Sequence, residues 1–165
     1  MRRAFYTAIM AARQIDQWPF GNDVCELTIF GRTEQLREAL QAGADPNTKD
    51  ERYNMTLLMI AINDYKLEVV DLLLAQPGIQ VNAKDTGSTA LHVACAHGDR
   101  PDMLGKVLAA PGLLMNERDI EGWTPIMLAV AKRRTDAVRL MVAVNEVDLD
   151  VRDNDGKTLE ELVRW

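Results

Sequence analysis

The chain has 165 residues, of which 47% are apolar, so it can bury a core and is not expected to be disordered. Its net charge of −6 and its pI near 4.9 argue against a surface for duplex nucleic acid, which needs a concentration of Lys and Arg. No stretch reaches the roughly 18–20 apolar residues of a membrane-spanning helix. Two distant cysteines, Cys25 and Cys95, suggest neither a zinc motif nor a disulfide framework and suit a reducing compartment, so we expect an intracellular protein, cytoplasmic or nuclear.

Residues 1–21 are predicted to form an N-terminal capping helix and a linker. Phe5, Ile9 and Ala12 recur at helical spacing and would pack on the segment that follows. The same stretch is basic, with three Arg and no acid in MRRAFYTAIMAARQI, and is therefore also similar to a mitochondrial transit peptide. Both interpretations of this segment stay open.

From residue 22 onward the sequence repeats itself about every 34 residues. One column of the repeat is polar and three are apolar, and all four keep the same register. The columns are Asn47, Asn82, Asn116 and Asp150; Leu36, Val70, Leu104 and Val138; Ala39, Leu73, Val107 and Met141; and Leu40, Leu74, Leu108 and Val142. Self-similarity at such a period indicates a solenoid in which each unit packs on its neighbours.

Each unit has the same internal order. A turn comes first, and a threonine follows whose hydroxyl can cap the free amides of a new helix. These threonines are Thr56, Thr89, Thr124 and Thr158. A short apolar helix such as ALHVACA comes next, and after a break a second helix such as LEVVDLLLA. We therefore expect a repeat domain over 22–165, with repeats at about 22–48, 49–83, 84–117 and 118–151 and a half repeat at 152–165.

Two kinds of motif resemble the ankyrin repeat family. Thr89-Ala90-Leu91-His92 and Thr124-Pro125-Ile126-Met127 are similar to that family's Thr-Pro-Leu-His box, and Gly43-Ala44-Asp45-Pro46-Asn47 is similar to its repeat ending. The resemblance covers about residues 22–165. It implies an all-α ankyrin-repeat solenoid of stacked helix-turn-helix units with short hairpin fingers. It also implies that His92 makes structural hydrogen bonds between backbone segments.

The sequence departs from the pattern at the turn between the two helices of a unit. Tyr65 and Arg133 stand where Gly31 and Gly98 stand in the other copies. A left-handed backbone there would cost about 1 kcal/mol for a residue other than glycine. The first repeat also lacks a recognisable threonine box.

Signals for chemistry are weak. Gly156-Lys157-Thr158 lacks the glycine five residues earlier that a phosphate-binding loop needs, and Val151 stands where a calcium loop would begin. His92 and Cys95 lie three residues apart on one short helix and are expected to be core residues. We expect no catalytic residues, no cofactor and no metal, and therefore no enzyme. Hydroxylation of Asn82 and Asn116 is a weak hypothesis, carried by the resemblance.

Positions that differ between repeats beside the common framework are the candidates for partner binding. By resemblance, they lie on the fingers and near the ends of the inner helices. The candidates are Arg52, Tyr53, Met55, Ile120, Glu121 and Trp123 on the fingers, and Asn63, Asp64, His97 and Lys132 at the helix ends. Trp123 is equally suited to pack on the neighbouring finger. Lys132 opens the run Lys132-Arg133-Arg134, which is either a solvated helix end or a partner contact.

The predicted function is a protein-protein interaction module or scaffold, a monomer that binds a protein or peptide and neither nucleic acid nor membrane. Two alternatives remain. The array is a non-catalytic ankyrin domain of a larger enzyme or effector, or it reads a basic peptide such as a histone tail, as the acidic balance and exposed aromatic residues suggest.

Overall fold

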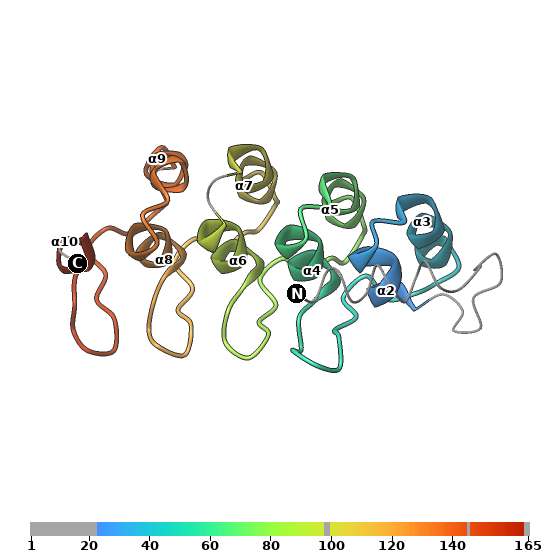
Figure 1. Cartoon of the computed structure of the whole chain (residues 1–165), viewed down its shortest axis with the longest axis horizontal. Coiled ribbons are helices and arrows are strands. Elements are labelled where there is room, and N and C mark those ends of the chain that lie inside the picture. Colours follow the sequence, from blue (N-terminus) through green and yellow to red (C-terminus); the bar gives the residue numbers. More distant parts are fainter. Residues whose placement is uncertain (1–22, 98–99, 145, 164–165) are drawn as a thin grey trace, which may run out of the picture.

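The protein, described here by a computed structural model over residues 23–97, 100–144 and 146–163, is a row of antiparallel helix pairs. Figure 1 shows the pairs side by side, with a hairpin finger projecting on the same side of each inner helix. The helices are α2 (Val24–Ile29), α3 (Thr33–Gln41), α4 (Leu57–Asn63), α5 (Leu67–Leu74), α6 (Ala90–Ala96), α7 (Pro101–Leu108), α8 (Pro125–Ala131), α9 (Thr135–Val142) and α10 (Leu159–Val163). This arrangement confirms the predicted all-α solenoid. The predicted N-terminal helix at 1–21 lies outside the described residues.

The inner helices begin at the side chains that the sequence indicated. Thr56 accepts a hydrogen bond from the backbone N–H of Met59 (3.3 Å), and Thr89 caps α6 in the same way. In the first repeat, which has no threonine box, Asp23 caps α2 by accepting from the N–H of Cys25 (2.9 Å). A side-chain oxygen at this position satisfies an amide that the helix itself cannot.

Thr124 is the exception among these caps. Its Oγ1 atom is buried and has no hydrogen-bond partner among the described residues. The third repeat shows why, because there Thr89 Oγ1 lies 2.8 Å from Nδ1 of His92. Met127 occupies the position of His92 in the fourth repeat, and its thioether offers no comparable partner.

We expect Thr124→Val to raise the free energy of unfolding by about 1 kcal/mol, since it replaces a buried unpaired hydroxyl with a methyl group of similar size. The matched change Thr89→Val removes a paired hydroxyl and should lower the unfolding free energy by about 1–2 kcal/mol. Urea denaturation followed by circular dichroism measures both. Equal losses from the two variants would show that the Thr124 hydroxyl has a partner.

The turns between paired helices confirm the expected left-handed backbone. Tyr65 has a φ of 56° and Arg133 a φ of 55°, close to the 65° of Gly31. A side chain in this region is strained, so the surrounding structure must hold it there. At Tyr65 the strain places an aromatic ring beside the end of the next inner helix, as described below.

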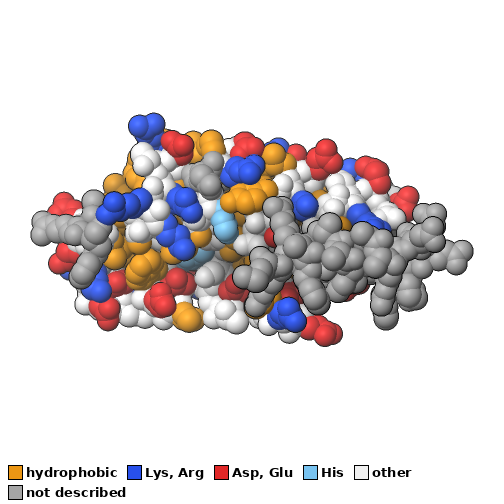
Figure 2. Space-filling view, in the orientation of Figure 1, with side chains coloured by type: hydrophobic (Ala, Val, Ile, Leu, Met, Phe, Trp, Pro, Cys, Tyr) orange, Lys and Arg blue, Asp and Glu red, His pale blue; other side chains and the backbone are white. Residues whose placement is uncertain are grey.

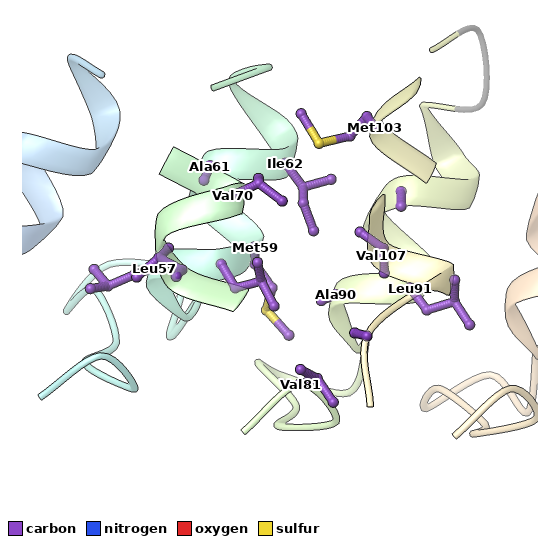
Figure 3. Packing of buried hydrophobic residues seen from close by; sticks show 14 of the residues in the cluster. Leu57, Met59, Ala61, Ile62, Val70, Val81, Ala90, Leu91, Met103 and Val107 are labelled. Atoms are coloured by element: carbon purple, nitrogen blue, oxygen red, sulfur yellow. The ribbon is translucent and has the colours of Figure 1, made fainter. Parts of the chain in front are cut away.

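The core runs continuously along the stack. Leu36, Val70 and Leu104 are fully buried members of one repeat column. Figure 3 shows Ile62 and Met103 between the second and third helix pairs, with Val107 and Ala90 facing them from the third pair. Apolar columns thus join each repeat to the next, which explains why a single pair of short helices is not a stable unit.

The last members of two columns are less covered. Leu149 is 51% exposed, whereas its counterparts Val81 and Met115 are 7% and 5% exposed. Val142 on α9 is 50% exposed. No described outer helix packs on α9 from the side opposite α7, so these two apolar side chains meet solvent.

Candidate functional site

Each finger is held by an aspartate at its base. Asp50 Oδ1 accepts a hydrogen bond from the N–H of Met55 across the hairpin (2.7 Å), and Asp119 Oδ1 accepts from the N–H of Trp123 (2.9 Å). Asp85 and Asp153 make equivalent bonds in their own fingers. A carboxylate that gathers several backbone amides fixes the loop around it. Sequence reasoning missed this column, although each of its aspartates follows the column of Asn47 by three residues.

The fingers are also joined to one another. Asn82 donates to the carbonyl of Gly112 (2.7 Å) and accepts from the N–H of Leu114 (2.9 Å) in the next repeat. Asn47 and Asn116 repeat this bridge. Lys84 donates to the carbonyl of Arg118 (2.9 Å). The row of fingers is therefore a connected surface, so a partner would meet ordered groups at little entropic cost.

The finger tips carry most of the predicted partner-binding residues. Ile120 is 72% exposed and Tyr53 is 49% exposed, and both are large apolar side chains. Ile120 leans on Gly87 of the preceding finger, where a Cβ atom would not fit. Arg52 and Glu121 are exposed and Met55 is partly buried. The Arg52 guanidinium lies 5.9 Å from the centre of the Tyr53 ring.

Trp123 lies partly buried between repeats. Its indole Nε1 donates to Oδ2 of Asp153 on the next finger (3.2 Å), and its carbonyl accepts from Nε2 of His92 in the preceding repeat (3.0 Å). The structure therefore places Trp123 against its neighbours, as one of the two sequence interpretations expected. Contact of Trp123 with a partner stays a prediction.

Hydrogen bonding perturbs Asp153. Burial acts to raise the pKa of this carboxyl, but the backbone N–H groups of Lys157 and Asp155 and the indole N–H of Trp123 lower the pKa below its ordinary value. The charged form is thereby favoured. Asp153 is thus a structural anion at the finger base.

The second group of predicted residues lies at the far ends of the inner helices. Asn63 and Lys132 are exposed, and Asp64 is partly buried. His97 is partly buried, although the sequence suggested that it is exposed. Its Nε2 lies 3.2 Å from Oδ1 of Asn63, and its Nδ1 lies 3.2 Å from the hydroxyl of Tyr65.

Two residues that sequence reasoning did not select complete this group. The Tyr65 ring meets the His97 ring edge-on, with centroids 5.7 Å apart, and the Arg100 guanidinium lies 4.3 Å from the centre of the same Tyr65 ring. The strained backbone of Tyr65 was the available signal, since such strain often accompanies function.

The structure keeps the two predicted groups apart. The fingers precede the inner helices and the second group ends them, and α4 has seven residues, so about 10 Å of helix separates the groups. Within the groups, the structure brings together Arg52 with Tyr53 and Asn63 with His97. The candidate site is therefore an extended surface with two rims.

The potential nucleophiles are buried. Burial raises the pKa of the Cys95 thiol to about 12, and burial with the nearby Asp23 raises that of Cys25 to about 12, so both are thiols at neutral pH. No group of three or more His, Cys, Asp or Glu side chains in the described parts of the chain is arranged to hold a metal ion. None of the described helices is both long enough and apolar enough to cross a membrane.

Comparison with known proteins gives consistent family matches. A family model described as "Ankyrin repeats (3 copies)" matches residues 24–110, and one described as "Ankyrin repeat" matches residues 121–154. The chain is 33% identical over 140 residues to the glycerophosphocholine phosphodiesterase gde1 of Schizosaccharomyces pombe, with 82% of the chain and 12% of that protein covered.

Two further relatives have different names. The chain is 31% identical over 130 residues to NF-kappa-B inhibitor zeta of Bos taurus, which covers 74% of the chain and 18% of that protein. It is 27% identical over 146 residues to a Caenorhabditis elegans homolog of transient receptor potential cation channel subfamily A member 1, which covers 82% of the chain and 12% of that protein. The chain thus spans less than a fifth of the length of these relatives.

Proposed function

Because the chain belongs to the ankyrin-repeat family, we propose that it is a protein-interaction module that holds a partner protein or peptide on its finger tips and inner-helix ends. The observation that carries this proposal is the pair of exposed apolar side chains, Tyr53 and Ile120, on fingers that hydrogen bonds hold in place. Large exposed side chains on a rigid support are favourable anchors, because little entropy is lost when they are buried.

The proposed surface uses the residues selected from the sequence. Arg52, Tyr53, Met55, Ile120 and Glu121 form the finger rim. Asn63, Asp64, His97 and Lys132 form the inner rim, and Trp123 supports the finger rim from below. The polar inner rim would add hydrogen bonds and charge contacts that orient the partner.

We propose that the chain performs no catalysis itself. The buried Cys95 thiol and the hydrogen-bonded His92 are structural, so neither supplies a nucleophile or a base. A cytoplasmic or nuclear location fits the two free, buried cysteines, and a monomeric state fits a module of this kind.

A second proposal is that the same array serves as a non-catalytic ankyrin domain of a larger enzyme or effector. The match to a phosphodiesterase supports it, since that protein is much longer than the matched region. Both proposals give this chain the same task of binding, and differ in what the binding controls.

We expect the double change Tyr53→Ala with Ile120→Ala to weaken partner binding at least about tenfold, because residues of this kind often contribute about 2 kcal/mol each when buried at an interface. The partner would be captured from a lysate, identified by mass spectrometry, purified and titrated against the purified chain by calorimetry. Leu149→Ala is the control, since Leu149 is also half exposed but lies off the proposed surface. An unchanged affinity in the double variant, with unchanged circular dichroism, would refute the finger site.

A further inference from the structure

A basic residue stands immediately before every outer helix. Arg32, Lys66, Arg100 and Arg134 are the N-cap residues of α3, α5, α7 and α9, and they recur every 34 residues. We name these four residues the basic row. The row went unnoticed in the sequence because its members are far apart in the chain, and only the stacking of the repeats brings them into line.

Contacts with the preceding repeat orient the members of the row. The Arg134 Nε donates to the carbonyl of Ala96 (3.1 Å), and the Arg100 guanidinium lies over the ring of Tyr65. The Lys66 side chain lies against Gly31. Each cation therefore leans back toward the neighbouring repeat, so the row follows one edge of the stack. Figure 2 shows Lys and Arg side chains in a band across the middle of one face, with acidic side chains mainly along its upper and lower edges.

The charge of the row is not consumed by ion pairs within the described residues. The ion pairs found there use other cations, namely Arg37, Lys84, Lys106, Arg139 and Lys157. A row of unpaired cations is unexpected in a protein with a net charge of −6.

Acidic residues two positions after each cation are engaged elsewhere. Glu34 pairs with Arg37 (3.4 Å) and Asp136 with Arg139 (3.8 Å), in both cases one turn along the same helix. Glu68 accepts from the hydroxyl of Thr33 (3.4 Å). Asp102 Oδ1 accepts from the N–H of Met103, the next residue in α7 (2.9 Å). These carboxylates lie in the first turns of the outer helices and leave the basic row unneutralised.

We propose that the basic row binds an acidic, extended segment of a partner protein that carries a carboxylate at about every third residue. Packed helices lie about 8–10 Å apart, which sets the spacing of the row. A polyproline II segment has three residues per turn and rises about 3.1 Å per residue, so every third side chain lies on one face about 9 Å from the last. The two spacings match. Lys132 and Arg133, beside Arg134, extend the row at one end.

A peptide fits this edge better than a nucleic acid does. Duplex DNA carries a charge about every 1.7 Å along its axis, and such a continuous polyanion would also approach the acids between the cations. A peptide places its carboxylates only opposite the cations. The inference rests on the proposed binding function, because the row borders the inner rim through the contact of Arg100 with Tyr65, and it disfavours a basic peptide along this edge.

The test is fluorescence anisotropy with a labelled peptide of about twelve residues that has Glu at every third position, separated by Pro and Ser. A second peptide of the same composition has its glutamates clustered. We expect the purified chain to bind the spaced peptide about tenfold more tightly than the clustered one, with an affinity that falls as salt rises.

Two double variants of equal net charge locate the site. Arg32→Gln with Lys66→Gln should weaken binding of the spaced peptide about tenfold, because two of four contacts are lost. Arg37→Gln with Arg139→Gln removes two cations outside the row and should change the affinity less than about twofold. Circular dichroism checks that both variants fold.

Several outcomes would overturn the inference. They are absence of binding, equal binding of the two peptides, equal effects of the two double variants, or tighter binding of a single-stranded oligonucleotide or of vesicles containing phosphatidylserine. A purified partner that depends on Tyr53 and Ile120 but is indifferent to Arg32 and Lys66 would also refute the basic row and leave the proposed function standing.

Discussion

Replacing Leu104 with alanine is expected to lower the free energy of unfolding by about 3 kcal/mol. Leu104 is fully buried on α7, in the column that also contains Leu36 and Val70. Helix α7 packs on α5, α6 and α9, so a cavity at Leu104 weakens contacts with both neighbouring repeats as well as the partner helix. Urea denaturation followed by far-ultraviolet circular dichroism measures the change.

The matched control is Leu114→Ala. Leu114 is 51% exposed at the end of the third repeat, and its loss should change the unfolding free energy by less than about 0.5 kcal/mol. A similar loss for the two leucines would mean that the column of Leu104 does not form the buried contact between repeats.

Replacing His92 with alanine is expected to cost about 3 kcal/mol, since the change combines a cavity with unpaired polar groups. The side chain is fully buried. Its Nε2–H donates to the carbonyl of Trp123 (3.0 Å), and its Nδ1 accepts from the N–H and the hydroxyl of Thr89 (3.2 Å and 2.8 Å). One side chain thus caps α6 and holds the next finger. Urea denaturation measures the loss, and a cost below about 1 kcal/mol would contradict this role.

The change His92→Met separates packing from hydrogen bonding. Methionine occupies the same position in the neighbouring repeats, as the buried Met59 and Met127. The variant should keep the packing and lose the hydrogen bonds, with a cost of about 1–2 kcal/mol. If it costs as much as alanine, packing around His92 does not resemble that around its counterparts.

Acid titration gives an independent check on His92. Burial lowers the pKa of this imidazole below its ordinary value of 6.5, although the Trp123 carbonyl and the Asp119 carboxylate act in the opposite direction. The unfolded chain therefore binds a proton more readily than the folded one, and the contribution of His92 to stability falls as the pH drops below about 6.5. The difference in stability between the natural chain and His92→Met should be smaller at about pH 5.5 than at about pH 7.5. His97 is present in both proteins and cancels.

The helical framework followed from local and repeated signals. The threonine caps, the apolar spacing within each short helix and the columns at 34-residue intervals all express contacts that every repeat makes in the same way. Such contacts leave the same residue type at the same place in each copy. The left-handed turns at Tyr65 and Arg133 were predictable for the same reason, since glycine marks the equivalent turn at Gly31.

The candidate site was predictable only in part. The sequence separated the variable finger residues from the framework, and Tyr53 and Ile120 are indeed exposed. It did not distinguish an exposed Trp123 from one bonded to Asp153, because that choice depends on the distance between two fingers. It also missed the shielding of His97 by Tyr65, which lies in another repeat.

The sequence by itself determined the period, the helix pairs, their caps and the buried columns, because these arise within one repeat or are written identically in each. The tertiary structure alone decided which side chains meet between repeats: the hydrogen bonds of His92 and Trp123, the missing partner of Thr124, and the alignment of Arg32, Lys66, Arg100 and Arg134 along one edge. These contacts join residues about 30 or more positions apart, and they depend on how far and in which direction one repeat is displaced from the next. That displacement comes from side-chain packing across the whole interface, which no single column of the sequence encodes.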